Sequence, residues 1–537
     1  MAAMGDITQE DPLGNEETTV PGFAPDTISS SVTNMPLAGG STMLSKLGLY
    51  RNPYTDRTAE KTTLKSGAFY LHSDLQGFEP SETTYIFFGR RGSGKTTIRL
   101  MMMQRYLKHN EHMAKQGKRP FFVVDLCRPG HMEDCLKAYM RANQADKDNW
   151  DAVFQEAWKS TDLADCIVSF AINDMMRRVA HGSSEGGEII LNLCKDKRSA
   201  AQFLLLSHLY TREDSATLAA LRKKLLQSRF SPSRIFKHLV TFAVVGAACA
   251  GLAFTYQTYF QNSAIADSQL VKLTFAHPKL AIGSFALGST GLVGIMNRRT
   301  RTKNKERAEQ LCAPVKIAEA RVDLVEKLLD RLASPDDSAD VLRRLHVGHS
   351  AQQKLELLSN LCKACGYEGL AVFGDCFDEV GLLDPLLYPT ALKAFAREVC
   401  RNEILNQGRL HFFFPDSRAS LDLSTDRVVR EARFDRHFVR DLTWSRFQLQ
   451  DLAERRFLSA QQEMDGGNNG QPKFASLFEH VSREDFSGAI SKLHTPRELM
   501  VFMTELLARV EAHAEDNTMV AAQDMEIAVA KAQAQSV

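Results

Sequence analysis

Short apolar runs, bounded by polar or turn-forming residues, recur along the chain. They lie at residues 85–88, 119–126, 369–374 and 409–414. Runs of this kind are typical of strands that are buried on both faces of a parallel sheet. Other stretches repeat apolar residues at steps of three and four, which predicts helices, most clearly at 163–179, 200–209, 316–333, 353–365 and 495–510. The alternation predicts an α/β fold, with a parallel sheet and helices on both of its faces.

Two longer uncharged runs, residues 239–260 and 280–296, break this pattern. A helix needs about 20 residues to span the hydrocarbon of a bilayer, so the first run is long enough and the second is at the short limit. Basic residues flank the pair on both outer sides, which places both flanks in the cytoplasm. The sequence thus predicts a transmembrane hairpin with the lipid bilayer as a partner, in a two-span membrane protein with cytoplasmic termini. A buried helical hairpin, or one covered by a partner protein, is the alternative.

A glycine-rich loop follows the first apolar run and precedes a helix-prone stretch. Its residues are Gly89, Arg90, Arg91, Gly92, Ser93, Gly94, Lys95 and Thr96, with Thr97 next in the helix. In this arrangement backbone N–H groups at the helix N-terminus bind phosphates, the lysine reaches the β and γ oxygens, and the threonine hydroxyl ligates magnesium. The pattern is that of a Walker A loop. It predicts ATP and Mg²⁺ as cofactors, with Lys95 in the catalytic group.

Three acidic residues follow the third apolar run. Asp375 comes directly after it, and Asp378 and Glu379 come three and four positions later. A magnesium ion on a nucleotide needs a carboxylate from a neighbouring strand, so Asp375 is predicted to hold the metal, directly or through water. Glu379 is predicted to orient or deprotonate the attacking water, and Asp378 completes the predicted catalytic group. The alternative is an acidic turn after a buried strand.

Further candidates lie beyond the fourth apolar run. Ser417 and Arg418 follow its end and are candidates for contact with the γ-phosphate or the water. Arg497 stands beside Pro496 at a predicted helix start and is a candidate to close on the phosphates from a lid; a solvated charge is the alternative. The arginines available to complete the site of a neighbouring subunit, in a homo-oligomer or with a partner protein, are Arg433, Arg436 and Arg440.

The order of these motifs resembles that of AAA+ and STAND P-loop NTPases. A membrane hairpin inserted between Walker A and Walker B resembles the KAP group of that class. Bacterial archaeal-initiator-like ATPases are similar at Asn52-Pro53-Tyr54, Phe88 to Thr96, Trp444 with Leu449 and Leu452, and Thr495-Pro496-Arg497. The likeness covers roughly residues 50–112 and 350–510.

This resemblance implies roles that add to the reading of the residues. Lys95 and Thr96 would bind phosphate and magnesium, Asp375 would be the metal carboxylate, Glu379 the catalytic glutamate and Arg497 a lid sensor. The family usually has a bulky apolar residue where this chain has Gly374, and Pro415 precedes the candidate sensor. The resemblance also implies an ATP hydrolase that is anchored in the bacterial inner membrane and acts as a nucleotide-controlled switch. Proteins of this type often serve bacterial defence against phage or plasmids.

At 537 residues the chain is long enough for two or three domains. The predicted segments are a disordered arm at 1–47, the first half of the NTPase core at 48–131, a helical insertion at 132–235, the hairpin at 236–298, juxtamembrane helices at 299–349, the second half of the core at 350–440, a helical lid at 441–515 and a C-terminal tail at 516–537.

Composition narrows the possible partners. The formal net charge of +1 gives no global attraction to nucleic acid, which makes nucleic acid an unlikely partner and a DNA-acting ATPase an alternative. An ATP-binding scaffold that hydrolyses nothing is the other alternative. The ten cysteines have no framework spacing, which favours a reducing compartment. Cys362 and Cys365 lie on a predicted helix, so they are interpreted as packing residues and not as a zinc or dithiol pair.

Overall fold

The computed structural model describes residues 83–211, 213–227, 302–319, 321–332, 350–416, 437–462, 474–515 and 518–535, with isolated positions before residue 83 and between 416 and 437. The runs 239–260 and 280–296, on which the hairpin was predicted, lie outside the described residues. Ser417, Arg418, Arg433 and Arg436 also lie outside them.

Five parallel strands form the central sheet. They are β1 (Tyr85–Phe88), β2 (Phe122–Asp125), β3 (Leu370–Gly374), β4 (Leu410–Phe414) and β5 (Phe438–Asp441), in the order β2-β3-β4-β1-β5. The predicted α/β fold with a parallel sheet is confirmed, and the four apolar runs supply β1 to β4. The pattern did not predict β5. This strand lies at the edge of the sheet, where its residues are only half-buried or exposed, so it lacks a continuous apolar run.

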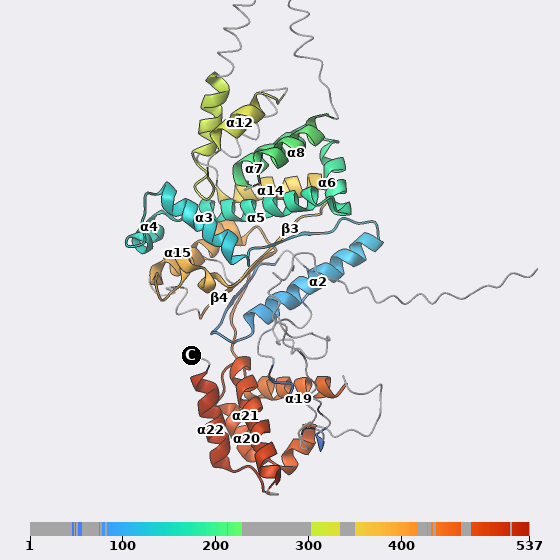
Figure 1. The fold of residues 1–537 in the computed structure, drawn as a ribbon, viewed down its shortest axis with the longest axis vertical. Helices are drawn as coiled ribbons and strands as arrows, with labels where there is room; N and C mark the ends of the chain where they lie inside the picture. The colour runs from blue at the N-terminus through green and yellow to red at the C-terminus, as the bar shows by residue number, and fades with distance from the viewer. Residues whose placement is uncertain are drawn as a thin grey trace, which may run out of the picture.

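Alternate residues of each strand face opposite sides of the sheet. In β1, Ile86 and Phe88 pack into one core, while Phe87 packs into another core with residues of α2 (Lys95–Lys115). In Figure 1, α2 crosses one side of the sheet, and helices of the central part of the chain are stacked on the other. Both faces are therefore covered, which is why the strands are almost wholly apolar.

The segment predicted as a helical insertion forms a stack of helices. They are α3 (Pro129–Ala142), α4 (Trp150–Ala157), α5 (Ser160–Ala180), α6 (Ser184–Leu193), α7 (Lys197–Tyr210) and α8 (Ser215–Gln227). Helix α5 is buried along most of its length and packs against α14 (Ala351–Cys365). A buried ion pair joins these two helices, with 2.7 Å between Lys354 Nζ and Asp165 Oδ2. The insertion is thus one packed unit with the helix that leads into β3.

Helix α14 has the sequence-predicted caps at both ends. Ser350 and Gln353 form a capping box, in which each side chain accepts a hydrogen bond from the other residue's backbone N–H. Gly366 is the C-cap, with a left-handed φ of 106°. Cys362 and Cys365 are buried on this helix, and burial raises the pKa of the Cys365 thiol to about 12. The two thiols therefore stay protonated and pack as apolar groups.

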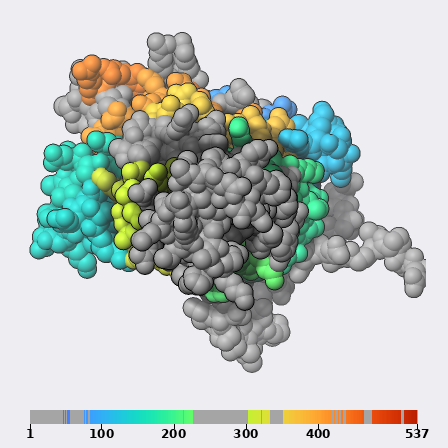
Figure 2. Space-filling view, turned by 90° about the horizontal axis from the view of Figure 1, so that it is seen from above, coloured from blue at the N-terminus to red at the C-terminus, as the bar shows by residue number. Residues whose placement is uncertain are grey.

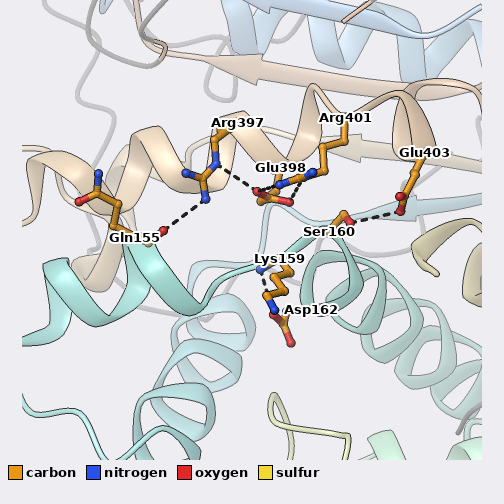
Figure 3. A network of polar contacts seen from close by, with 8 residues as sticks. All are labelled: Gln155, Lys159, Ser160, Asp162, Arg397, Glu398, Arg401 and Glu403. Atoms are coloured by element: carbon orange, nitrogen blue, oxygen red, sulfur yellow. Dashed lines mark hydrogen bonds and ion pairs between the residues drawn. The ribbon is translucent and has the colours of Figure 1, made fainter. Parts of the chain in front are cut away.

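A buried carboxylate secures the segment between β3 and β4. This segment contains η4 (Phe377–Glu379), η5 (Gly381–Leu383), α15 (Pro389–Val399) and α16 (Asn402–Leu405). Glu398 is fully buried, and Figure 3 shows its carboxylate between the side chains of Arg397 and Arg401. Arg397 also donates to the backbone carbonyl of Gln155 in α4, at 3.3 Å. The two arginines compensate the buried charge and link α15 to the insertion.

Residues 302–312 are helical and lead through turns to α12 (Val322–Leu329). The single helix predicted at 316–333 is therefore shorter than expected. It begins late because the preceding turn packs against α3: Lys316 Nζ lies 3.2 Å from Asn143 Oδ1, and Ile317 is buried. In the view from above, this segment lies beside the helices of the insertion (Figure 2).

The C-terminal region forms a helical unit with its own core. Its helices are α19 (Arg446–Gln462), η7 (Phe474–Glu479), α20 (Arg483–Ser491), α21 (Pro496–Glu515) and α22 (Ala522–Ala534). We call this unit the lid. Helix α22 lies in the predicted C-terminal tail, but Met525 and Val529 are buried in the lid core. Tyr54 joins the same core from the N-terminal part of the chain, and its hydroxyl donates to the Ala453 carbonyl at 2.7 Å.

The prediction of a two-span inner-membrane protein is corrected by the structure. Among the described residues, no helix is both long and apolar enough to cross a bilayer. The longest helices, α2 and α5, have 21 residues each, but charged side chains are distributed along both. Such charges are costly in hydrocarbon.

Candidate functional site

The glycine-rich loop connects the end of β1 to the start of α2. Gly94 is the N-cap of α2 and has a left-handed φ of 90°, a conformation that glycine adopts without the steric cost of a Cβ. Within the loop, the Ser93 N–H donates to the Arg90 carbonyl at 3.1 Å. The chain thus turns tightly and enters the helix at Lys95, which leaves the first N–H groups of α2 without intrahelical acceptors.

Lys95 folds back over this loop. Its Nζ donates to the Gly89 carbonyl at 2.8 Å and to the Arg90 carbonyl at 3.4 Å. Burial lowers the pKa of Lys95, and the charges of Asp378 and Asp375 oppose that effect. The ammonium group is therefore held at the mouth of the loop, with acidic groups of the β3 end around it.

Thr96 contacts the end of β3 directly. Its hydroxyl donates to Asp375 Oδ2 at 2.9 Å, although 279 positions separate the two residues. Asp375 is only 3 % exposed. Because the hydroxyl uses its hydrogen on the carboxylate, its oxygen lone pairs remain able to accept or to coordinate. The structure thus brings together two of the residues that the sequence assigns to the metal.

Arg99 is a site residue that was not predicted. It lies one turn after Lys95 on α2 and is 3 % exposed. Its Nη1 lies 3.0 Å from Asp125 Oδ2 at the end of β2, and its Nε lies 3.5 Å from Asp375 Oδ2. The guanidinium therefore bridges two carboxylates from neighbouring strands. Residues four apart lie on one face of a helix, so the sequence places Arg99 on the same face as Lys95. The strands that carry the two carboxylates could not be identified from the sequence.

The remaining acidic candidates lie on η4. Cys376, which precedes η4, has a left-handed φ of 59°, and Phe377 is buried with its ring centroid 5.3 Å from that of Phe414. Asp378 is half-buried and is the carboxylate that acts most strongly on Lys95, whereas Glu379 is exposed. The turn thus directs Asp378 toward the loop more closely than Glu379.

The thiol beside these carboxylates is held in its protonated form. Burial, with the charges of Asp375 and Glu379, raises the pKa of Cys376 to about 12. A thiol with so high a pKa stays protonated at neutral pH, so it is a poor nucleophile and a poor metal ligand.

The lid lies against the outer side of the loop. The Trp444 indole N–H donates to the Ser93 carbonyl at 2.9 Å, and the backbone N–H of Arg497 donates to the Gly92 carbonyl at 3.2 Å. The predicted lid residue Arg497 therefore lies at the loop. In the sequence, Trp444 stands out only through the resemblance to the initiator-like ATPases. At the end of β4 the described polar residue is Asp416, whose Oδ2 lies 3.6 Å from Arg90 Nε.

Comparison with protein-family models, with curated proteins and with solved structures gave no match to this chain. The functional conclusion therefore depends on the geometry of the loop and its neighbours.

Proposed function

We propose that this chain is a Mg²⁺-dependent ATP hydrolase of the P-loop class, with an AAA+-like core and lid that act as a nucleotide-controlled switch. The observation that carries the proposal is the 2.9 Å hydrogen bond between Thr96 and Asp375. It joins the residue after the P-loop lysine to the carboxylate at the end of β3, which is the pairing that a nucleotide-bound magnesium ion requires.

The residues present fit a triphosphate. The N–H groups at the start of α2 and the positive end of its helix dipole favour an anion at this point. Lys95 would exchange the loop carbonyls that it now contacts for the β and γ oxygens, and Gly89 and Gly94 keep side chains away from them. Arg91 is exposed on the same loop and adds positive charge. Lys95 and the loop would thus hold the phosphates in place.

The residues also fit magnesium, provided that the nucleotide supplies part of its shell. Among the described residues, no group of three or more His, Cys, Asp or Glu could hold a metal ion alone. Mg²⁺ commonly binds through one or two protein ligands, waters and substrate phosphates. Thr96 would hold the ion through a lone pair of its hydroxyl oxygen, and Asp375, which accepts the hydroxyl hydrogen, would add negative charge beside it. When bound, the ion would neutralise charge that develops on the phosphate oxygens.

Asp378 and Glu379 are the candidates to orient the attacking water and to take its proton. Asp378 is the better placed of the two. It is half-buried, and its charge opposes the lowering of the Lys95 pKa. Lys95 would contact the γ-phosphate in this proposal. Glu379 is exposed, and a change of the lid or a neighbouring subunit would have to enclose it for the same role.

Phosphate release from ATP by the purified chain tests this function. Lys95→Ala and Asp375→Asn should each lower turnover about a hundredfold, the usual loss when one charge-stabilising group is removed. The matched control is Lys108→Ala, which removes an exposed lysine from the same helix and should leave turnover unchanged. Equal turnover in the parent and the Lys95 and Asp375 variants would contradict the proposal.

A second candidate is an ATP-binding scaffold without turnover, and the exposed position of Glu379 favours it. Asp378→Asn and Glu379→Gln separate the two functions. In a hydrolase, at least one of them lowers turnover without loss of ATP affinity. In a scaffold, the parent binds ATP and releases no phosphate, and neither variant changes that.

A further inference from the structure

The lid holds the backbone of the loop and not only its side chains. Two consecutive loop carbonyls accept hydrogen bonds from the lid: that of Gly92 from the Arg497 N–H, and that of Ser93 from the Trp444 indole. The Arg497 N–H belongs to the first turn of α21, where it has no intrahelical acceptor. The loop therefore also caps a lid helix.

The Walker A pattern does not explain why residue 92 is a glycine, but the structure does. That pattern fixes Gly89, Gly94, Lys95 and Thr96 and leaves position 92 open. In the structure, a Cβ on Gly92 would lie 2.5 Å from the Cβ of Arg497, and the residue has a φ of +82°. Any side chain at this position would have to displace the first turn of α21. Gly92 therefore allows the lid to dock.

The Trp444 contact fixes the orientation of one peptide group in the loop. In a planar trans peptide the C=O and the N–H point to opposite sides. When the indole holds the Ser93 carbonyl, the N–H of Gly94 in the same peptide points away from the lid. Gly94 caps α2, where N–H groups bind phosphate. The lid thus influences which way a phosphate donor points.

We propose that Trp444 is a positioning residue of the phosphate loop, and that it couples lid docking to nucleotide binding. The inference rests on the proposed function. Linkage makes the coupling reciprocal: if docking favours the phosphate-binding orientation, bound nucleotide favours docking by the same factor. One hydrogen bond between neutral groups corresponds to about a fivefold change in affinity.

Trp444 also provides its own readout. The chain has three tryptophans, and the other two, Trp150 and Trp158, are fully buried in the insertion. A change of intrinsic tryptophan emission on nucleotide binding should therefore come from Trp444. In Trp444→Phe this change should disappear, because the ring is kept against the loop but the indole and its N–H are lost.

The experiment compares affinities of the full chain for the non-hydrolysable analogue adenylyl imidodiphosphate with Mg²⁺, measured by calorimetry. Trp444→Phe should weaken binding about fivefold, and Gly92→Ala, whose added Cβ meets Arg497, should weaken it by about the same factor or more. Phe447→Leu changes an exposed ring in the first turn of α19 and should bind like the parent.

Gly117→Ala is the matched control for Gly92→Ala. Gly117 also has a positive φ, of +68°, but a Cβ there would meet nothing within 4 Å. It carries the backbone strain of the substitution without the lid contact, and should bind like the parent. Two results would overturn the coupling: a Gly92→Ala variant that binds like Gly117→Ala, or a Trp444→Phe variant that binds like the parent. A parent that binds no more tightly than Lys95→Ala would instead overturn the proposed function.

Discussion

Replacing Arg99 with methionine removes the cation that lies between Asp125 and Asp375. Methionine keeps an unbranched side chain of similar length in the core between α2 and the sheet. The two carboxylates remain, one of them 3 % exposed, without the positive charge that now lies 3.0 and 3.5 Å from them. At an effective dielectric constant of about 20, one such contact is worth roughly 5 kcal/mol before desolvation is subtracted. Removing one partner of a buried pair typically costs about 3–5 kcal/mol, so a loss in this range is expected.

The companion variants separate charge from packing. Asp125→Asn removes one carboxylate and keeps its shape, so the double variant Arg99→Met with Asp125→Asn should lose less than the sum of the single losses. The difference is the coupling energy, expected at about 1–3 kcal/mol for residues in direct contact. The assay is chemical denaturation, monitored by hydrogen exchange of the backbone amides of α2 and β2. A local measurement is needed because a chain of several domains does not unfold in one step. Additive losses, or an Arg99→Met variant as stable as the parent, would refute the bridging role.

Two buried groups should give opposite pH dependence of stability. Burial lowers the pKa of His411 to about 3. Between pH 6.5 and 3, the imidazole therefore binds a proton in the unfolded chain but not in the folded chain. The free energy of unfolding should fall as pH drops through this range, by up to about 1.4 kcal/mol per pH unit. His411→Gln should flatten this slope in thermal unfolding measured against pH, and an unchanged slope would contradict the assignment. Burial raises the pKa of Asp162 to about 6, so its contribution is present below pH 3.8 and is lost as pH rises through 6. Asp162→Asn should therefore be more stable than the parent above pH 6, by at most about 3 kcal/mol, and equal melting temperatures at pH 7 would exclude this.

The residues that the sequence predicted best are those whose chemistry is local. The loop from Gly89 to Thr96 was found because its spacing is set by one strand, one turn and one helix, and Asp375 because it ends an apolar run. The sequence alone also predicts their contact, since each needs the other around a magnesium ion. The order of the strands was not predictable, and β4 lies between β1 and β3.

The residues that the sequence missed depend on contacts between distant segments. An arginine such as Arg99 on a helix usually extends into solvent, and the positions of Asp125 and Asp375 at the ends of β2 and β3 explain its burial. Gly374, where the families that this chain resembles usually have a bulky apolar residue, also depends on such a contact. A Cβ there would lie 2.6 Å from the Phe377 ring and 2.9 Å from Phe412, so aromatic side chains already occupy that space. The contacts of Arg99 with Asp125 and of Gly374 with Phe412 do not follow from spacing along the chain.

If the loop binds a nucleotide as proposed, the charges around it give a reason for the lid to respond. Two cations, Lys95 and Arg99, lie near three carboxylates, those of Asp125, Asp375 and Asp378. These groups alone leave a surplus of negative charge, and a triphosphate adds more than one magnesium ion removes. The loop N–H groups and the exposed Arg91 offset part of it. The remainder favours positive charge from the lid side, where the backbone N–H of Arg497 donates to the Gly92 carbonyl. In the proposed switch, loss of the γ-phosphate would weaken that attraction. The hydrogen bonds from Trp444 and Arg497 to the loop would then hold the lid without it.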